Sequence, residues 1–316
     1  MDAGSITRET YERLIAHGAG LAAAARTAVV HPCDVPALGG AMAAARAKLI
    51  VPLLVGPEAR IRGVAAAAAI DLAGVQIIDA PHSHASAAQA VALVRAGQAT
   101  ALMKGSLHTD ELLEAVVDHA TGIRTERRIS HVFVMDVPRY PKPLFITDAA
   151  VNIAPTLDVK VDIVVNAIGL AHALGIARPK VAILAAVEMV SAKMPSTIDA
   201  AALCKMAERG QITGAILDGP LAFDNAISRD AAATKGIVSP VAGDADILLV
   251  PDLEAGNMLA KELTFLAGAE AAGIVLGARV PIILTSRADS GRTRLASAAV
   301  AAIYAHARRA LASSGA

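Results

Sequence analysis

The chain has 316 residues, which predicts two domains, because a domain usually spans about 100–200 residues. Hydrophobic residues make up 55% of the sequence and aromatic residues only 2%, while 29 basic residues balance 29 acidic ones. A nucleic-acid surface or a polybasic membrane patch needs an excess of positive charge, and base stacking needs aromatic side chains. The composition therefore argues against both kinds of surface.

Short runs rich in valine and isoleucine alternate along the chain with alanine-rich windows of helical pattern. The predicted strands are residues 27–32, 49–56, 74–81, 100–106, 129–138, 143–151, 180–187, 212–220, 245–252 and 280–286. The predicted helices are residues 5–25, 37–47, 58–73, 85–97, 109–119, 157–174, 197–209, 254–268 and 290–311. The strand runs are mostly apolar without alternation, which is typical of a parallel sheet covered on both faces. The pattern predicts an α/β fold with a mostly parallel sheet.

The link RYPK joins the predicted strands 129–138 and 143–151 with no helix between them, which interrupts the alternation of strands and helices. Prolines and a basic pair in so short a connection indicate a hairpin or a tight crossover. We take this point as the entry to a second domain, and the four-strand block before it as the first.

The expected location follows from the amino-terminal segment, the apolar runs and the cysteines. MDAGSITRETYERL is polar and acidic, unlike a signal peptide. The longest apolar stretch, residues 163–177, is too short and too polar to span a bilayer. Cys33 and Cys204 lie far apart and form no metal or redox spacing. We therefore expect a soluble cytoplasmic protein.

Polar or glycine-containing turns follow several predicted strands, and open α/β sheets bind ligands at such strand ends. Lys104 and Gly105 place a positive charge and an exposed backbone N–H before a helix, which suits a phosphate or a carboxylate. The alternative is a solvated loop lysine. Asp218 is either an acid at the edge of a cleft or part of a simple turn before a helix.

Another candidate follows the predicted strand 245–252. Gly256 and Asn257 come after this strand, and Lys261 lies four residues beyond Asn257, so both side chains share one helical face. That face could meet an anion. Asn257 either donates to a ligand or only caps the helix.

The sharpest local pattern is Ser286-Arg287, directly after the last predicted strand. Arginine offers a planar fork of donors that matches phosphate oxygens. A helix beginning near Ser290 would point its free N–H groups at the same place. Asp289 is either the N-cap of that helix or a catalytic acid–base group.

Common catalytic patterns are missing from the sequence. It contains no G-x-x-x-x-G-K-[ST] loop, no G-x-G-x-x-G after the first strand and no G-x-S-x-G elbow. His82 and His84 have no acidic or cysteine partner nearby in the sequence, so we expect no metal site. The residues indicate an anion-binding cleft, and a reaction whose nucleophile is itself a bound anion would fit it.

Four segments stand in order along the chain: ALMKGSLHTDELL (101–113), ILDGPLAFDNAIS (216–228), SPVAGDADILLVPDLEAGNMLAKEL (239–263) and the later LTSR. Together they resemble the phosphate acetyltransferase and phosphate butyryltransferase family. The likeness runs nearly from end to end. The segments MKGSLHT and FVMDVPRYPKPLFITDAAVNIAP look closer to the butyryl-type and short stand-alone branch.

This resemblance implies a two-domain α/β fold similar to isocitrate and isopropylmalate dehydrogenases, with mostly parallel sheets and the active site in an interdomain cleft. The first domain would be discontinuous, residues 1–124 plus 273–316, and the second would be residues 125–272. The resemblance also implies a homodimer.

The implied activity is that of a phosphate acyltransferase, which converts acyl-CoA and phosphate into acyl phosphate and CoA. Phosphate would attack the thioester directly, without a metal, a cofactor or an acyl-enzyme, so coenzyme A and phosphate are substrates only. The enzyme would hold two anionic reactants together, stabilise the oxyanion and manage one proton. Acetyl phosphate is slightly favoured as the product, and butyryl phosphate stays open.

Carried onto this chain, the family's Ser-Arg pair matches Ser286 and Arg287. Arg287 would bind phosphate or the acyl phosphate, and Ser286 would hydrogen-bond the thiol sulfur or the carbonyl oxygen. Asn257 and Lys261 match the family's GN…K segment and would sit in the cleft.

Two positions depart from the acetyl-specific branch. That branch has an aspartate, implicated as general base, where this chain has Thr293, and we nominate Asp289 in its place. It also has an arginine where this chain has Leu113, and Lys104 is our candidate substitute. These departures keep a non-catalytic acyl-CoA-binding paralogue open as an alternative. An NAD(P)-dependent oxidoreductase of the same fold is less favoured, because the arginines and metal-binding aspartates it needs are not clearly present.

Overall fold

The computed structural model describes residues 9–285 and 289–313. The chain divides into two compact units. The discontinuous unit comprises Tyr11–Arg127 and Ala272–Ala316, and the inserted unit is built on Arg128–Ala271. Among the described residues, no helix is long and apolar enough to cross a bilayer.

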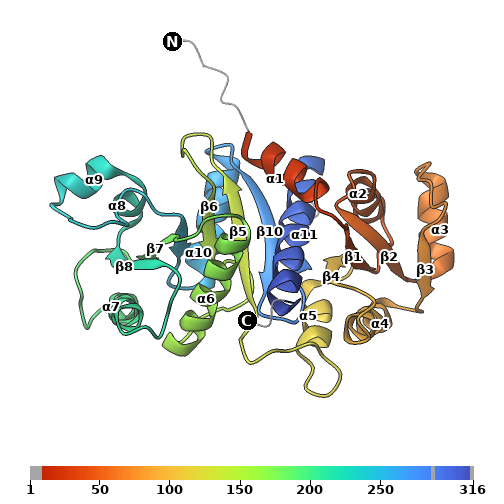
Figure 1. Ribbon diagram of the computed structural model, residues 1–316, viewed down its shortest axis with the longest axis horizontal. Helices are drawn as coiled ribbons and strands as arrows, with labels where there is room; N and C mark the ends of the chain where they lie inside the picture. Colours follow the sequence, from red (N-terminus) through yellow and green to blue (C-terminus); the bar gives the residue numbers. More distant parts are fainter. Residues whose placement is uncertain (1–8, 286–288, 314–316) are drawn as a thin grey trace, which may run out of the picture. The chain divides into compact units, whose positions relative to one another are not determined.

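The discontinuous unit is a sheet with helices on both faces (Figure 1). Its helices are α1 (Glu9–Ala19), α2 (Val35–Arg46), α3 (Glu58–Ala67), α4 (Ser83–Arg95), α5 (Thr109–Val117) and α11 (Gly291–Ser313). Its strands are β1 (Ala25–Val30), β2 (Ile50–Gly56), β3 (Gln76–Asp79), β4 (Ala101–Lys104), β10 (Glu270–Leu276) and β11 (Ile282–Ile283). They lie in the order β3-β2-β1-β4-β11-β10, parallel except for the β10–β11 pair. Because buried β1, β2 and β4 are apolar along most of their length, helices must cover both faces.

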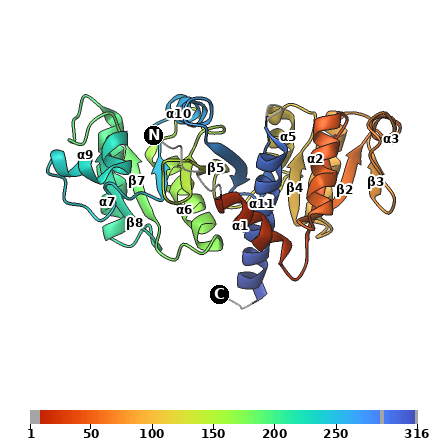
Figure 2. The ribbon, with the colours of Figure 1, turned by 90° about the horizontal axis from the view of Figure 1, so that it is seen from above.

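The inserted unit repeats the α/β pattern on a smaller sheet, and the two views show helices α6 and α10 beside it (Figures 1 and 2). Its strands are β5 (Ser130–Asp136), β6 (Leu144–Thr147), β7 (Lys180–Leu184), β8 (Ile216–Leu221) and β9 (Ile247–Leu249). Its helices are α6 (Leu157–Ala173), α7 (Pro195–Glu208), α8 (Phe223–Ile227), α9 (Arg229–Thr234) and α10 (Leu253–Phe265). The strand order is β5-β6-β9-β7-β8, and only the β5–β6 pair is antiparallel. The RYPK link is therefore a hairpin connection.

Two strands and two short helices differ from the sequence-based expectation. Strand β10 was missed, and the strand expected at 280–286 is reduced to Ile282–Ile283. Residues 270–284 are mostly apolar, and the chain reverses near Gly277, whose φ is +90°. The short helices α8 and α9 were also missed, because five and six residues show too little periodicity.

Candidate active site

The carboxyl end of β4 carries the predicted residues Lys104 and Gly105. Lys104 is half-buried and lies in register with Val30, the last residue of β1. The backbone N–H of Gly105 donates to the carbonyl of Val30 at 2.9 Å. The turns after these two parallel strands are therefore joined at the sheet edge where α/β proteins bind ligands.

This junction has no space for a side chain at Gly105. A Cβ atom there would lie 2.2 Å from the carbonyl oxygen of Val30 and 2.6 Å from that of His31. The next residue, Ser106, braces the same contact, because its hydroxyl donates to the carbonyl of His31 at 2.8 Å and accepts from the N–H of Cys33 at 3.1 Å. The close approach of the backbone thus explains why this position is glycine, and the half-buried Lys104 directly precedes it.

The sequence predicts that the catalytic residues come just before α11. Two of them, Ser286 and Arg287, lie outside the described residues. Asp289 is described and half-buried. The hydroxyl of Ser290 accepts from the N–H of Thr293 at 3.1 Å, which makes Ser290 the cap of α11. The capping role considered for Asp289 therefore belongs to its neighbour.

The first turns of α10 carry the other predicted group. Gly256 is buried, and a Cβ atom there would lie 2.8 Å from the carbonyl oxygen of Asp148. The side-chain amide nitrogen of Asn257 donates to the carbonyl of Ala149 at 3.1 Å. Lys261, one turn later, is exposed. Gly256 and Asn257 thus seat α10 on the turn that follows β6.

That turn contains a buried carboxylate which the sequence reading overlooked. Asp148 is 2% exposed. Its carboxylate accepts from the N–H groups of Ala150, Val151 and Asn152 at 2.9, 3.0 and 3.2 Å, and from the Asn152 amide at 2.6 Å. The pattern was visible in the sequence, as an aspartate at a strand end with an asparagine four residues later, but such residues are common in ordinary turns.

Asp218 lies within a strand and not in a turn before a helix. Strand β8 continues to Leu221, so Asp218 lies within it and pairs in register with Ala182. Its carboxylate accepts from the N–H of Gly219 at 2.9 Å. Burial, together with the charge of Asp218, raises the pKa of Cys204 to about 12. Asp218 therefore lies on β8, the edge strand of the inserted unit, close to the unreactive thiol of Cys204 on α7.

The predicted site residues fall into two groups. The discontinuous unit holds Lys104, Gly105 and Asp289. The inserted unit holds Asp218, Gly256, Asn257 and Lys261. In the inserted unit the last three lie on α10 after β9, whereas β7 separates β9 from β8 and its Asp218.

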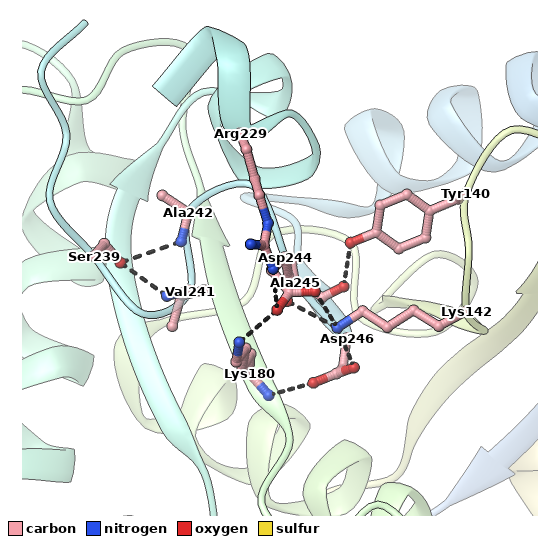
Figure 3. Close-up of polar contacts among 10 residues, drawn as sticks. All are labelled: Tyr140, Lys142, Lys180, Arg229, Ser239, Val241, Ala242, Asp244, Ala245 and Asp246. Carbon is pink, nitrogen blue, oxygen red and sulfur yellow. Dashed lines mark hydrogen bonds and ion pairs between the residues drawn. The ribbon is translucent and has the colours of Figure 1, made fainter. Parts of the chain in front are cut away.

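Two acidic residues before β9 belong to a separate ion cluster, shown in Figure 3. Asp244 pairs with three cations, Lys180 at 2.5 Å, Lys142 at 2.9 Å and Arg229 at 3.2 Å. Asp246 also pairs with Lys142, at 2.6 Å. The cluster lies at the amino ends of β7 and β9, opposite the strand ends where ligands bind. Asp244 and Asp246 therefore stabilise the fold, although they belong to the segment 239–263, which resembles the family.

Backbone contacts reinforce this cluster. The hydroxyl of Tyr140 donates to the carbonyl of Ala245 at 2.6 Å (Figure 3). The hydroxyl of Ser239 accepts from the N–H groups of Val241 and Ala242 at 3.0 and 3.2 Å. The hairpin link between β5 and β6 is thereby fastened to the loop before β9.

Asp244→Asn is expected to lower the free energy of unfolding at pH 7 by about 2 kcal/mol. Burial acts to raise the pKa of Asp244, but hydrogen bonds from Lys180 and Lys142 outweigh it and lower the pKa to about 2. A carboxylate with a lowered folded-state pKa stabilises above its unfolded pKa, near 4, and this contribution of about 2 kcal/mol is lost as pH falls through about 2.

Urea unfolding at several pH values tests this expectation. The gap between the wild type and Asp244→Asn should narrow steadily below pH 4. Asp230→Asn is the matched control, because Asp230 is exposed on α9 of the same unit and should change stability little. Equal losses for both variants, or a gap that does not depend on pH, would contradict the assignment.

Within residues 9–285 and 289–313, no three histidine, cysteine, aspartate or glutamate side chains gather in a way that could hold a metal ion.

Known proteins are similar to this chain in sequence and in fold. The family described as phosphate acetyl/butaryl transferase matches residues 83–302. A phosphate acetyltransferase of Rhizobium meliloti is 68% identical over 300 residues, covering 95% of both chains. A phosphate butyryltransferase of Clostridium acetobutylicum is 42% identical over 280 residues, covering 89% of this chain and 93% of its own. The solved structure of a branched-chain phosphotransacylase from Enterococcus faecalis V583 has a TM-score of 0.77 and 31% identity, covering 89% of this chain and 99% of its own.

Proposed function

Because the chain belongs to the phosphate acetyl/butyryl transferase family, we propose that it converts acyl-CoA and phosphate into acyl phosphate and CoA. The observation that carries this proposal is the 68% identity to a phosphate acetyltransferase over 95% of both chains. Acetyl is the favoured acyl group, since identity to the butyryltransferase is lower, at 42%. Butyryl is the alternative.

In this proposal phosphate is the nucleophile. A phosphate oxygen attacks the thioester carbonyl, the new C–O bond forms, and the C–S electron pair leaves with the sulfur of CoA. No acyl-enzyme, metal or further cofactor takes part. The protein contributes by holding two anions together and by stabilising the charge that develops on the carbonyl oxygen.

In this proposal, residues that follow different strands have different roles in binding the substrates. Lys104, half-buried at the end of β4, and Arg287, which comes after β11 in the sequence, bind phosphate. Ser286 hydrogen-bonds the thioester. Asn257 and Lys261 on α10 contact the acyl-CoA substrate. Asp289 is the candidate group for proton transfer, and the cap formed by Ser290 supports this role because it relieves Asp289 of capping α11.

The finer organisation is also a proposal. We infer an isocitrate/isopropylmalate dehydrogenase-like chain with domains at residues 1–124 plus 273–316 and at 125–272. The breaks between the compact units at Arg127 and at Ala271 support the two inner boundaries of this division. We further propose a cytoplasmic homodimer. Met258 and Phe265 on α10 and Leu266, directly after it, are 64%, 77% and 82% exposed, which provides an apolar surface that a partner subunit could cover.

A thiol-release assay tests the activity. Purified protein with acetyl-CoA and phosphate should release free CoA, and the release should cease when sulfate replaces phosphate. The same assay with butyryl-CoA should give a lower kcat/KM. If no short acyl-CoA gives phosphate-dependent release, the enzyme proposal is wrong and the non-catalytic acyl-CoA-binding alternative takes its place.

A further inference from the structure

The turn after β6 is held in one shape by a single buried side chain. Both carboxylate oxygens of Asp148 are used, one by the N–H groups of Ala150 and Val151 and the other by the N–H and the side-chain amide of Asn152. The Asn152 amide also donates to the carbonyl of Ile129 at 2.9 Å. A buried carboxylate with this many N–H donors stabilises a turn far more than a neutral side chain would. Residues 148–152 therefore form a rigid platform at the ligand-binding edge of the inserted unit.

Helix α10 rests directly on this platform. The N–H of Leu253 donates to the carbonyl of Ile153 at 3.0 Å, and the Asn257 amide donates to the carbonyl of Ala149 at 3.1 Å. Gly256 lets the helix approach the carbonyl oxygen of Asp148, since a Cβ atom there would lie only 2.8 Å from it. The position of the Asn257 side chain thus depends on the shape of the turn that Asp148 maintains.

The contact with Ala149 also decides which way the Asn257 amide points. A carbonyl accepts hydrogen bonds only, so the nitrogen of the amide must face it. Within the described residues, the side-chain oxygen of Asn257 makes no hydrogen bond. This oxygen is an acceptor, and it suits a ligand that brings an N–H group. Phosphate consists mainly of acceptor oxygens near neutral pH, whereas the pantetheine arm of acyl-CoA carries amide N–H groups.

We propose that Asp148 is a positioning residue, which holds the turn 148–152 so that the Asn257 amide oxygen is presented to a pantetheine N–H of acyl-CoA. The inference rests on the proposed function and assigns Asn257 to the CoA half of that site. Asp148 itself does not touch the substrate. Its effect should therefore appear in the use of acyl-CoA and not in the use of phosphate.

Asp148→Asn tests the proposal with little change in size. One acceptor oxygen becomes an NH2 group that faces backbone N–H donors, so the turn should lose its fixed shape. The KM for acetyl-CoA should rise about tenfold, while the KM for phosphate stays within about twofold. Asp252→Asn is the matched control. Asp252 caps α10 by accepting from the N–H of Ala255 at 2.8 Å, and asparagine caps as well, so both KM values should stay unchanged.

A second variant covers the case in which Asp148→Asn does not fold. Asn257→Leu removes the amide and leaves Asp148 in place, and it should weaken inhibition by pantetheine about tenfold while inhibition by adenosine 3′,5′-bisphosphate is unchanged. Equal shifts for both inhibitors, or an unchanged KM for acetyl-CoA in a folded variant, would overturn the inference. Phosphate-dependent thiol release by the wild type decides the proposed function separately, so the two ideas can fail independently.

Discussion

Gly105→Ala is expected to destabilise the protein by at least about 3 kcal/mol and to abolish most of its activity. The added Cβ would lie 2.2 Å from the carbonyl oxygen of Val30, a backbone atom that cannot rotate away. Forcing atoms into a packed site typically costs about 1–3 kcal/mol, and a clash with backbone at this distance belongs at the upper end or beyond. Separating the turns would also displace Lys104 and break the hydrogen bonds of Ser106.

Gly63→Ala is the matched control for this substitution. Gly63 is exposed within α3, and nothing lies within 4 Å of the Cβ that alanine would add. Alanine is the better helix former, so this variant should be more stable by about 0.5–1 kcal/mol. Urea unfolding of the two variants should give changes of opposite sign. A folded, fully active Gly105→Ala protein would show that the two turns are not joined as described.

Arg287→Ala is expected to lower kcat/KM by about 30-fold to 900-fold, mainly through the use of phosphate. Arginine gives phosphate two parallel charged hydrogen bonds, and losing a charged partner of this kind costs about 2–4 kcal/mol in transition-state terms. Arg287→Lys should recover only part of the loss, because lysine keeps the charge without the planar fork. Steady-state kinetics with phosphate as the varied substrate measure both effects.

Arg279→Ala provides the comparison for Arg287. Arg279 is exposed and lies before β11, whereas Arg287 follows this strand. Its replacement removes an equal charge and should leave kcat/KM within about twofold, as expected for a surface residue away from the site. If Arg287→Ala behaves like Arg279→Ala, the phosphate site has been misplaced.

The sequence predicted the α/β alternation well, because parallel strands that are buried on both faces are apolar throughout and the helices between them are rich in alanine. The hairpin at RYPK was likewise foreseen, because prolines limit how so short a link can run. Strand β10 was missed because the apolar run at residues 280–284 follows Glu270–Leu276 closely in the sequence. In the structure the chain reverses between them near Gly277, which has a positive φ.

Less of the candidate site than of the fold could be predicted from the sequence. Asp289 and Ser290 are adjacent and both are good N-caps, so only the hydrogen bond to Thr293 shows which one caps α11. Asp148 looked like an ordinary turn residue, because its burial depends on α10, whose first residue comes more than 100 positions later in the chain. Contacts of this kind arise from tertiary packing and leave no periodic pattern.

The ion cluster around Asp244 has a consequence for the rates of folding and unfolding. Its two lysine partners are distant in sequence: Lys180 and Asp244 are 64 positions apart, and Lys142 and Asp244 are 102 positions apart. Closing such long loops is entropically costly, so we expect these ion pairs to form late, after most of the inserted unit has assembled. Interactions made late in folding slow unfolding more than they speed folding. We therefore expect the cluster to act chiefly by slowing unfolding, which would lengthen the lifetime of the native unit.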